Sequence, residues 1–337
     1  NNLQLSYSHA QMLSSQQTDR EIIIDCSIMG IGRGAGNLNT ELFAEYINRT
    51  MGTSYKISPL LEIMDRVITP IYQDKYWGYS LPYYLSATHN CHPNYATYLD
   101  DKNTLTYQNI HEIFQMMSPE KKVYFDKEYI RTLYVEYQTK NKSDVTESFA
   151  LQKALTGREV LVLAPGRSML DEAEHVKAFI AKRRPVVISV NFVPEEIPVD
   201  FVFISNLRRW ENLRGNKHLK VILTSNLDIA GIDMADCFVA DYKSLLNTQD
   251  KVKDNAGMML LAFLIKVAAK KIYLAGMDGY SVDAAPNFVA PNMEFHKKPV
   301  VMNAMNSGMS AVISQYMKKI PIVFLTAPRY VKPNCQG

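Results

Sequence analysis

The sequence predicts an α/β protein, and three observations support this prediction. The composition is that of a globular protein, with 47% hydrophobic and 21% charged residues over 337 positions, and a chain of this length has room for two domains. Residues 145–337 alternate short β-forming runs with amphipathic helices, which is typical of a doubly wound, mostly parallel, Rossmann-like sheet. The first 54 residues indicate a helix, a strand, a glycine-rich loop and a second helix. We therefore expect three segments, 1–54, 55–144 and 145–337.

The first segment opens with a predicted helix over residues 1–17, where apolar residues recur at a loose helical spacing. Residues 21–28 contain three consecutive isoleucines and predict a buried strand. Four glycines follow within residues 30–36, and Thr40 begins the next helix. The order of these elements places the glycine loop between a strand and a helix.

The second segment, residues 55–144, is predicted to be mostly helical and is rich in tyrosine. The polar stretch 139–144 marks its boundary. His89 and His92 are three residues apart, which can place two imidazoles on one helix face. Pro93 follows at once and no second ligand pair is near in the sequence, so a zinc site at these histidines is not favoured.

The third segment alternates predicted strands and helices, as is typical of a parallel sheet. Strands are predicted at 160–163, 185–190, 200–204, 220–223, 237–240, 271–275 and 321–325. Helices are predicted at 169–182, 256–269 and 303–318.

Charge and hydropathy restrict the partners that the sequence predicts. The net charge is +3, too small to indicate a nucleic acid or an anionic membrane. No run of 18 apolar residues occurs, so we expect no transmembrane helix. The four cysteines, at positions 26, 91, 237 and 335, are scattered without metal-binding spacing, which favours reduced thiols in a cytoplasmic protein. A homo-oligomer is left open.

The glycine loop comprises Gly30, Gly32, Gly34 and Gly36. Glycine permits positive φ and lets a ligand approach the backbone closely, and a helix N-terminus attracts anions. The loop is therefore a candidate site for a carboxylate or phosphate. It lacks the lysine of a P-loop and the spacing of a dinucleotide fingerprint, and a tight strand-to-helix turn without a ligand is an equal alternative.

The residues around this loop carry a resemblance. Residues 1–5 (NNLQL), 25–37 (DCSIMGIGRGAGN) and the pair Thr40 and Glu41 resemble, in that order, the end of the barrel in 4-hydroxy-2-oxovalerate aldolase and hydroxymethylglutaryl-CoA lyase. These are metal-dependent (β/α)8 lyases. The similarity extends over residues 1–100 and is fairly specific, because several elements recur in order.

The resemblance implies that residues 1–54 hold the last strand and helices of a truncated TIM barrel, followed by a helical extension over 55–144. In the family, the two metal-binding histidines precede the position of Asn1. The resemblance therefore implies that this sequence is the C-terminal part of a longer protein, and that the fragment alone is inactive.

Site residues follow from the same resemblance. Asn37 matches the family asparagine at or near a divalent metal, and an amide oxygen suits Mg²⁺ or Mn²⁺. Gly30, Gly32, Gly34 and Gly36 match the loop at the barrel mouth, where such enzymes hold substrate. Tyr79 follows Gly78 in a pair that also occurs after the barrel in the aldolase, and a tyrosine can act as a catalytic proton donor. The alternatives are a helix cap or turn residue for Asn37 and aromatic packing for Tyr79.

The implied activity is carbon–carbon bond cleavage or formation beside a 2-oxo group, with a divalent metal to stabilise the developing negative charge. The substrate would be a small 2-oxo acid or a sugar-derived molecule. The expected setting is the synthesis of surface polysaccharide precursors.

Polar residues follow the predicted strands of the third segment. Gly166, Arg167 and Ser168 form a turn after the first strand, Asn191 follows the second, and Asp278 follows the strand at 271–275. In an open α/β sheet, ligands bind at the carboxyl ends of strands near a switch in strand order. We therefore expect a nucleotide or nucleotide-sugar at these residues, with an ordinary capped turn as the alternative.

This third segment is similar, more loosely, to sialyltransferase-like domains of cell-surface polysaccharide synthesis. The resemblance implies a nucleotide-sugar-dependent glycosyltransferase or a nucleotide-binding module in residues 145–337, as an alternative to the lyase. Such transferases use a catalytic histidine, for which His218 and His296 are the candidates. A non-catalytic scaffold module is the third alternative.

Overall fold

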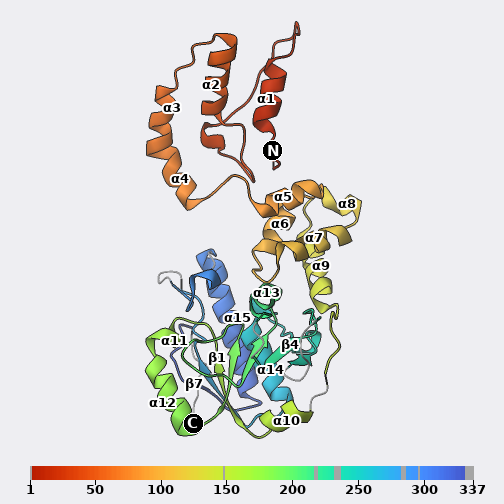
Figure 1. Ribbon diagram of the computed structural model, residues 1–337, viewed down its shortest axis with the longest axis vertical. Coiled ribbons are helices and arrows are strands. Elements are labelled where there is room, and N and C mark those ends of the chain that lie inside the picture. Colours follow the sequence, from red (N-terminus) through yellow and green to blue (C-terminus); the bar gives the residue numbers. More distant parts are fainter. Residues whose placement is uncertain are drawn as a thin grey trace. The chain divides into compact units, whose positions relative to one another are not determined.

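The computed structural model describes residues 2–146, 149–215, 219–230, 237–281, 286–294 and 297–330. The chain forms two compact units, Asn1–Tyr134 and Val135–Gly337 (Figure 1). The first unit is helical, and the second contains a parallel sheet with its helices.

The first unit consists of short helices and helical turns in sequence. Its elements are α1 (Ser6–Ser14), η1 (Ile28–Gly30), α2 (Thr40–Met51), α3 (Ser58–Ile63), the π-helical η2 (Met64–Ile68), α4 (Thr69–Asp74), α5 (Leu81–Thr88), α6 (Pro93–Asp100), α7 (Tyr107–Met116), α8 (Pro119–Lys122) and α9 (Lys127–Thr139), which runs into the second unit. Among its described residues, no strand forms.

The strand predicted over residues 21–28 is therefore wrong. Only an isolated bridge joins Ser27 to Asn39, and the side chain of Ile23 is 80% exposed. A run of isoleucines predicts burial, but a strand also needs a neighbouring strand to receive its hydrogen bonds. No such neighbour exists among the described residues. The helix predicted over 1–17 is also shorter, spanning Ser6–Ser14.

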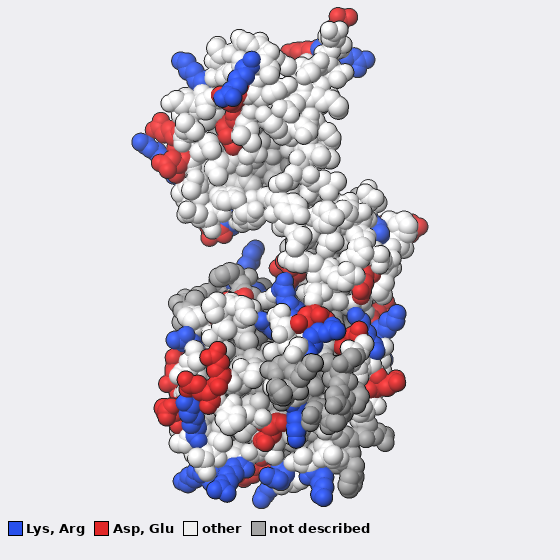
Figure 2. Space-filling view, in the orientation of Figure 1, with Lys and Arg blue, Asp and Glu red and all other residues white. Residues whose placement is uncertain are grey.

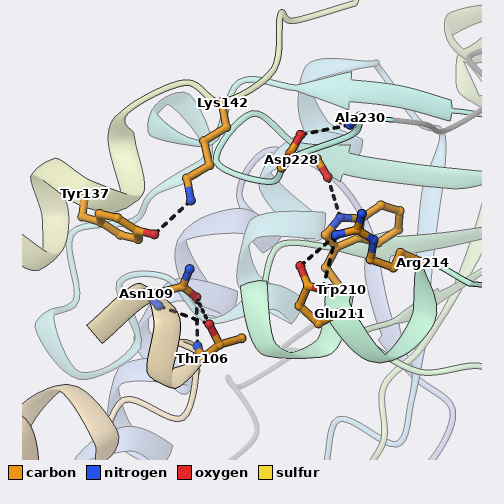
Figure 3. Close-up of polar contacts among 9 residues, drawn as sticks. All are labelled: Thr106, Asn109, Tyr137, Lys142, Trp210, Glu211, Arg214, Asp228 and Ala230. Carbon is orange, nitrogen blue, oxygen red and sulfur yellow. Dashed lines mark hydrogen bonds and ion pairs between the residues drawn. The ribbon is translucent and has the colours of Figure 1, made fainter. Parts of the chain in front are cut away.

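Helices α5, α6, α7 and α9 enclose a small core, in which Tyr95, Ile113 and Phe114 are fully buried. The N-terminus of α7 is fixed by a capping box, since Thr106 Oγ1 accepts from Asn109 N and Asn109 Oδ1 accepts from Thr106 N (Figure 3). Each bond satisfies a backbone N–H that the helix leaves without a partner. This part of the unit is the extension that the sequence predicts as helical.

The second unit is an α/β domain, and the seven strands among its described residues form one parallel sheet. The strands are β1 (Glu159–Leu163), β2 (Val186–Val190), β3 (Phe201–Ile204), β4 (Val221–Thr224), β5 (Cys237–Ala240), β6 (Lys271–Ala275) and β7 (Ile322–Phe324), in the order β5-β4-β3-β2-β1-β6-β7. The other elements are α10 (Phe149–Leu155), α11 (Ser168–Asp171), α12 (Ala173–Arg183), α13 (Leu207–Leu213), η4 (Lys243–Leu245), η5 (Asp250–Val252), α14 (Ala256–Lys266), η6 (Pro291–Met293) and α15 (Pro299–Met317).

Both faces of this sheet are covered by helices. In β1, Val160 and Val162 pack into the cluster that contains α14 and α15, whereas Leu161 and Leu163 pack into the cluster that contains α11 and α12. Successive side chains of a strand point to opposite faces, so the two clusters lie on opposite sides. Burial on both sides explains the continuous apolar runs that predict these strands. From β1 the chain adds strands β2 to β5 on one side, and then returns to add β6 and β7 on the other side of β1. The strand order therefore switches between the neighbours β1 and β6.

The surfaces of the two units differ in charge. The visible face of the first unit has wide stretches without charged side chains, whereas positive and negative side chains are interspersed on the second (Figure 2). Several large apolar side chains of the first unit are exposed, among them Leu61 in α3 and Ile71 in α4. No helix among the described residues is long and apolar enough to cross a membrane.

Candidate functional site

The glycine loop of the first unit folds back on itself between η1 and α2. Asn37 N donates to Gly30 O at 2.8 Å, and Ser27 N donates to Leu38 O at 2.9 Å. A Cβ at Gly36 would lie 2.6 Å from Gly30 O, and Gly36 has φ +82°. Only glycine permits both this approach and this backbone conformation, so Gly36 is needed to close the loop.

Asn37 lies at the surface of this loop in a defined orientation. Its amide Nδ2 donates to Ile31 O at 2.9 Å, and a Cβ at Gly32 would lie 2.5 Å from that nitrogen. Gly32 therefore leaves space for the Asn37 side chain. Its Oδ1 accepts no hydrogen bond from the described residues and is a donor atom suited to a hard cation. The described residues contain no group of three His, Cys, Asp or Glu side chains that could hold a metal ion.

The segment containing Tyr79 lies beside the loop. Trp77 Nε1 donates to Met29 O at 2.8 Å, and Gly78 N donates to Gly34 O at 3.1 Å. Tyr79 is 44% exposed, with its ring centroid 6.5 Å from that of Tyr84. The structure thus brings the backbone next to Tyr79 against the loop, and leaves the phenol ring accessible.

Two side chains that were not predicted as site residues hold the loop in place. Glu41 accepts from Met29 N at 3.0 Å and from Asn39 Nδ2 at 3.1 Å. Asn2 Oδ1 accepts from Ala35 N at 3.3 Å. Glu41 belongs to the sequence pattern behind the resemblance, whereas the contact of Asn2 spans 33 positions and has no local signal.

In the helical extension, His89 pairs with His111 and not with His92, the histidine that is near it in the sequence. His92 Nδ1 accepts from Asn94 N and caps α6. His89 Nε2 instead lies 2.8 Å from His111 Nδ1 on α7. Burial lowers the pKa of His89 below its ordinary value, and electrostatic repulsion from His111 and from Lys122 lowers it further. His111 is distant in sequence, so spacing alone could not reveal this pair.

In the second unit, Gly166 lies where the turns after β1 and β6 meet. Gly166 N donates to Gly276 O at 2.9 Å. A Cβ at Gly166 would overlap Gly276 O and would lie 2.6 Å from Asp278 Cγ. The glycine is therefore required by the close packing of two turns of the same sheet.

Ser168 and Asp278 form a hydrogen-bonded pair at this point. Asp278, which is buried, accepts from Ser168 N at 2.8 Å and from Ser168 Oγ at 2.5 Å. Thr326, after β7, lies 2.9 Å from Ser168 Oγ and accepts from Gly276 N. The structure thus joins Gly166, Ser168 and Asp278, as their positions at strand ends predict.

The backbone N–H groups of this turn are already bonded within the chain. Gly166 N and Ser168 N donate to Gly276 O and Asp278 Oδ2, and Arg167 N donates to Asn287 O at 3.1 Å. A ligand at this turn would therefore be held by side chains rather than by a backbone cradle. The guanidinium of Arg167 is half-exposed and lies 3.3 Å from Asp171 Oδ1.

Asn191 is placed one strand further along the sheet. It follows β2 with φ +59°, and its Oδ1 accepts from Ser205 N, after β3, at 3.3 Å. It therefore shares the carboxyl edge with Ser168 and Asp278, but its described contact is to β3. His218 and His296 lie outside the described residues.

Two further residues at this edge were missed from the sequence. Asn287 is buried and accepts from Arg329 Nη1 and from Ser281 N, each at 2.7 Å. Tyr330 is buried beside Asp278, and burial together with that carboxylate raises the pKa of its phenol. Both residues lie in irregular segments, which carry no periodic signal.

Comparison of the chain with protein-family models and with curated proteins finds no match.

Proposed function

We propose that the first unit contributes one side of an aldolase-type lyase site, which cleaves or forms a carbon–carbon bond beside the 2-oxo group of a small acid. The observation that supports this proposal best is the orientation of Asn37. Its Nδ2 is bonded to Ile31 O, so its Oδ1 is the atom presented at the loop surface. This amide oxygen would be one ligand of Mg²⁺ or Mn²⁺.

The residues of the chain would act on the substrate in distinct ways. The bound cation would supply Lewis-acid stabilisation of negative charge on the 2-oxo oxygen. In the cleavage direction a base takes the proton of the 4-hydroxyl, the C3–C4 bond breaks, and the electron pair moves toward the 2-oxo group. Tyr79, exposed beside the loop, would donate the proton that C3 then needs. Gly30 and Gly36 would let the loop fold closely enough to present Asn37 at its surface.

The exposed isoleucines also support this proposal. Ile22 and Ile23 are 40% and 80% exposed, although the sequence predicts burial for them. We propose that the remaining strands of a barrel, preceding Asn1 in a longer protein, cover these side chains and supply the other metal ligands. The setting that we propose is cytoplasmic synthesis of surface polysaccharide precursors.

The test uses the longer protein encoded with the sequence upstream of Asn1. Purified protein with Mg²⁺ or Mn²⁺ is expected to release pyruvate from a 4-hydroxy-2-oxo acid. Asn37→Ala is expected to weaken Mn²⁺ binding, measured by electron paramagnetic resonance, and to lower kcat/KM at least tenfold. Asn94→Ala, an exposed asparagine of the same unit, is the matched control. Absence of pyruvate release from every 4-hydroxy-2-oxo acid tested would overturn the proposal.

A second candidate function rests on the topology of the sheet. The carboxyl ends of β1 and β6 meet at the switch in strand order, with Ser168, Asp278 and Thr326 hydrogen-bonded there. Such switch points bind nucleotides in open α/β sheets. We propose that the second unit binds a nucleotide or nucleotide-sugar at this edge, either for glycosyl transfer or for binding alone.

Calorimetric titration of the full chain with CMP- and UDP-sugars tests this second candidate. We expect saturable binding by one of them, and a loss of affinity in Arg167→Gln. Glu174→Gln, on the exposed side of α12, is the control. Hydrolysis or transfer of the sugar would distinguish a transferase from a binding module, and no binding by either class would exclude the candidate.

A further inference from the structure

Helix α13 is held firmly at the carboxyl end of β3. Asn206 Oδ1 accepts from Arg209 N at 3.2 Å and caps the helix. Trp210 is 2% exposed, and its Nε1 donates to Asp228 O, after β4, at 2.7 Å (Figure 3). The indole thus fixes the helix against the next strand connection. Arg208 and Arg209 precede Trp210 directly and are therefore held at this edge of the sheet.

The guanidinium of Arg209 is partly buried and makes one hydrogen bond to the described residues. Its Nη2 donates to Asn292 O at 3.1 Å, and no carboxylate among the described residues pairs with it. Glu211, the only acidic residue of α13, bonds instead to Arg214 at 3.2 and 3.3 Å (Figure 3). A guanidinium has five N–H donors, so most of those on Arg209 remain available within the described part of the chain.

The surroundings of Arg209 disfavour its positive charge. Burial, followed by the charge of neighbouring Arg208, lowers the pKa of Arg209. The guanidinium is held at a free-energy cost that an anion would offset, because a partly buried charge is stabilised by an opposite charge at short range. A structural arginine at such a place is ordinarily paired with a carboxylate.

Residues 286–294 connect Arg209 to the switch point. Asn292 of this segment accepts from Arg209, and Asn287 accepts from Arg167 N and from Arg329 Nη1. Val289 N donates to Pro165 O at 3.0 Å. Three arginines from separate strand connections therefore contact one segment at the carboxyl edge.

Three acidic groups among the described residues of this edge have hydrogen-bond or ion-pair partners. Glu294 Oε1 accepts from Phe288 N at 2.8 Å, Asp278 accepts from Ser168, and Asp171 pairs with Arg167. Each of these carboxylates thus has a partner other than Arg209, and none of the three pairs with the Arg209 guanidinium.

We propose that Arg209 binds a phosphate group of the ligand at this edge, through the guanidinium donors that Asn292 leaves unused. An arginine fork matches two oxygens of a phosphate. The proposal rests on the second candidate function, which it extends by naming the side chain that recognises the phosphate. The ligand class is a nucleoside phosphate or diphosphate, and the guanidinium of Arg329, which donates to Asn287 Oδ1, adds positive charge along the same segment.

The experiment is calorimetric titration of the full chain with inorganic pyrophosphate, CMP and UDP. Arg209→Gln is expected to raise the Kd for all three at least tenfold, because a charge-assisted bidentate contact is lost. Arg209→Lys keeps the charge without the fork and is expected to give an intermediate Kd. Arg214→Gln, at the C-cap of the same helix but paired with Glu211, is the matched control and should leave Kd unchanged. Thermal unfolding of each variant reports whether it folds.

The outcomes separate this inference from the candidate function. Nucleotide binding that is unchanged in both Arg209 variants would overturn the role of Arg209 and leave the candidate function standing. Pyrophosphate binding that depends on Arg209, with no tighter binding of CMP or UDP, would retain the anion site and reject the nucleotide. No binding of any of the three by the unaltered chain would overturn both.

Discussion

Asp278 accepts hydrogen bonds from both the backbone N–H and the hydroxyl of Ser168, a residue 110 positions away in the sequence. This pair connects the turn after β1 to the turn after β6, which are the two strands between which the strand order switches. Because Asp278 is buried, its carboxylate depends on these donors for stabilisation.

Replacing Ser168 with alanine removes the hydroxyl donor to Asp278. We expect the free energy of unfolding to fall by about 1.5–3 kcal/mol, the range for hydrogen bonds to charged groups. Urea denaturation followed by circular dichroism measures the change. Ser307→Ala, an exposed serine on α15 whose hydroxyl bonds only within its own helix, should alter stability by less than about 0.5 kcal/mol. Equal losses in the two variants would contradict the role of the pair.

Gly166→Ala tests the close approach of the two turns. The added methyl would overlap Gly276 O and crowd Asp278, so we expect a loss of about 1–3 kcal/mol or more, as in other overpacked sites. The midpoint of urea unfolding measures it. Gly215→Ala is the control, since nothing lies within 4 Å of a Cβ at Gly215. A Gly166→Ala variant as stable as the control would show that the turns separate easily.

Protonation of His89 links stability to pH. Its pKa in the folded chain is lowered by burial, by His111 and by Lys122, so the unfolded chain binds the proton more readily. The stability contribution is therefore complete above the ordinary pKa of 6.5 and is lost as the pH falls below it toward the folded value. We expect urea midpoints to decrease from pH 7.5 to pH 5.5, and less steeply in His89→Asn.

His9→Asn is the matched control for this pH effect, because His9 is exposed on α1. Its pH profile is expected to follow that of the unaltered chain. A His89→Asn profile with an undiminished slope would show that other groups cause the acid sensitivity.

Trp77→Phe tests how the glycine loop is held. The phenyl ring retains most of the packing against Tyr72, but the bond from Trp77 Nε1 to Met29 O is lost. We expect a cost of about 1 kcal/mol and faster proteolytic cleavage within residues 30–36. Tyr76→Phe, whose exposed hydroxyl bonds to Tyr79 O at 3.3 Å, should cleave at the original rate. Identical cleavage of all three chains would argue against this anchoring role.

The sheet of the second unit was predictable because its strands carry a local signal. Apolar runs such as residues 160–163 mark strands buried on both faces, and the structure confirms β1 there. The same signal failed for residues 21–28, because an apolar run does not reveal whether a neighbouring strand is present. The apolar pattern thus predicts that a segment can form a strand. Whether the strand forms depends on a neighbouring segment that can pair with it.

The candidate sites were predictable only in part, for a related reason. Gly166, Ser168 and Asp278 could be placed together because parallel strands end at one edge of a sheet. Residues that the structure brings near the predicted ones, such as Asn287, Arg209 and His111, lie in loops or on helices distant in sequence. Their contacts depend on how elements pack, which no periodicity encodes.

The side chain and backbone carbonyl of Asn287 limit how far the lengths of the loops in this domain can change. Its carbonyl accepts from Arg167 N after β1, and its amide oxygen accepts from Ser281 N after β6 and from Arg329 after β7. Three connections that could otherwise lengthen or shorten separately are thereby coupled at a single residue. An insertion in any one of them would displace the other two, so length changes should be tolerated at the opposite, amino-terminal rim long before they are tolerated here.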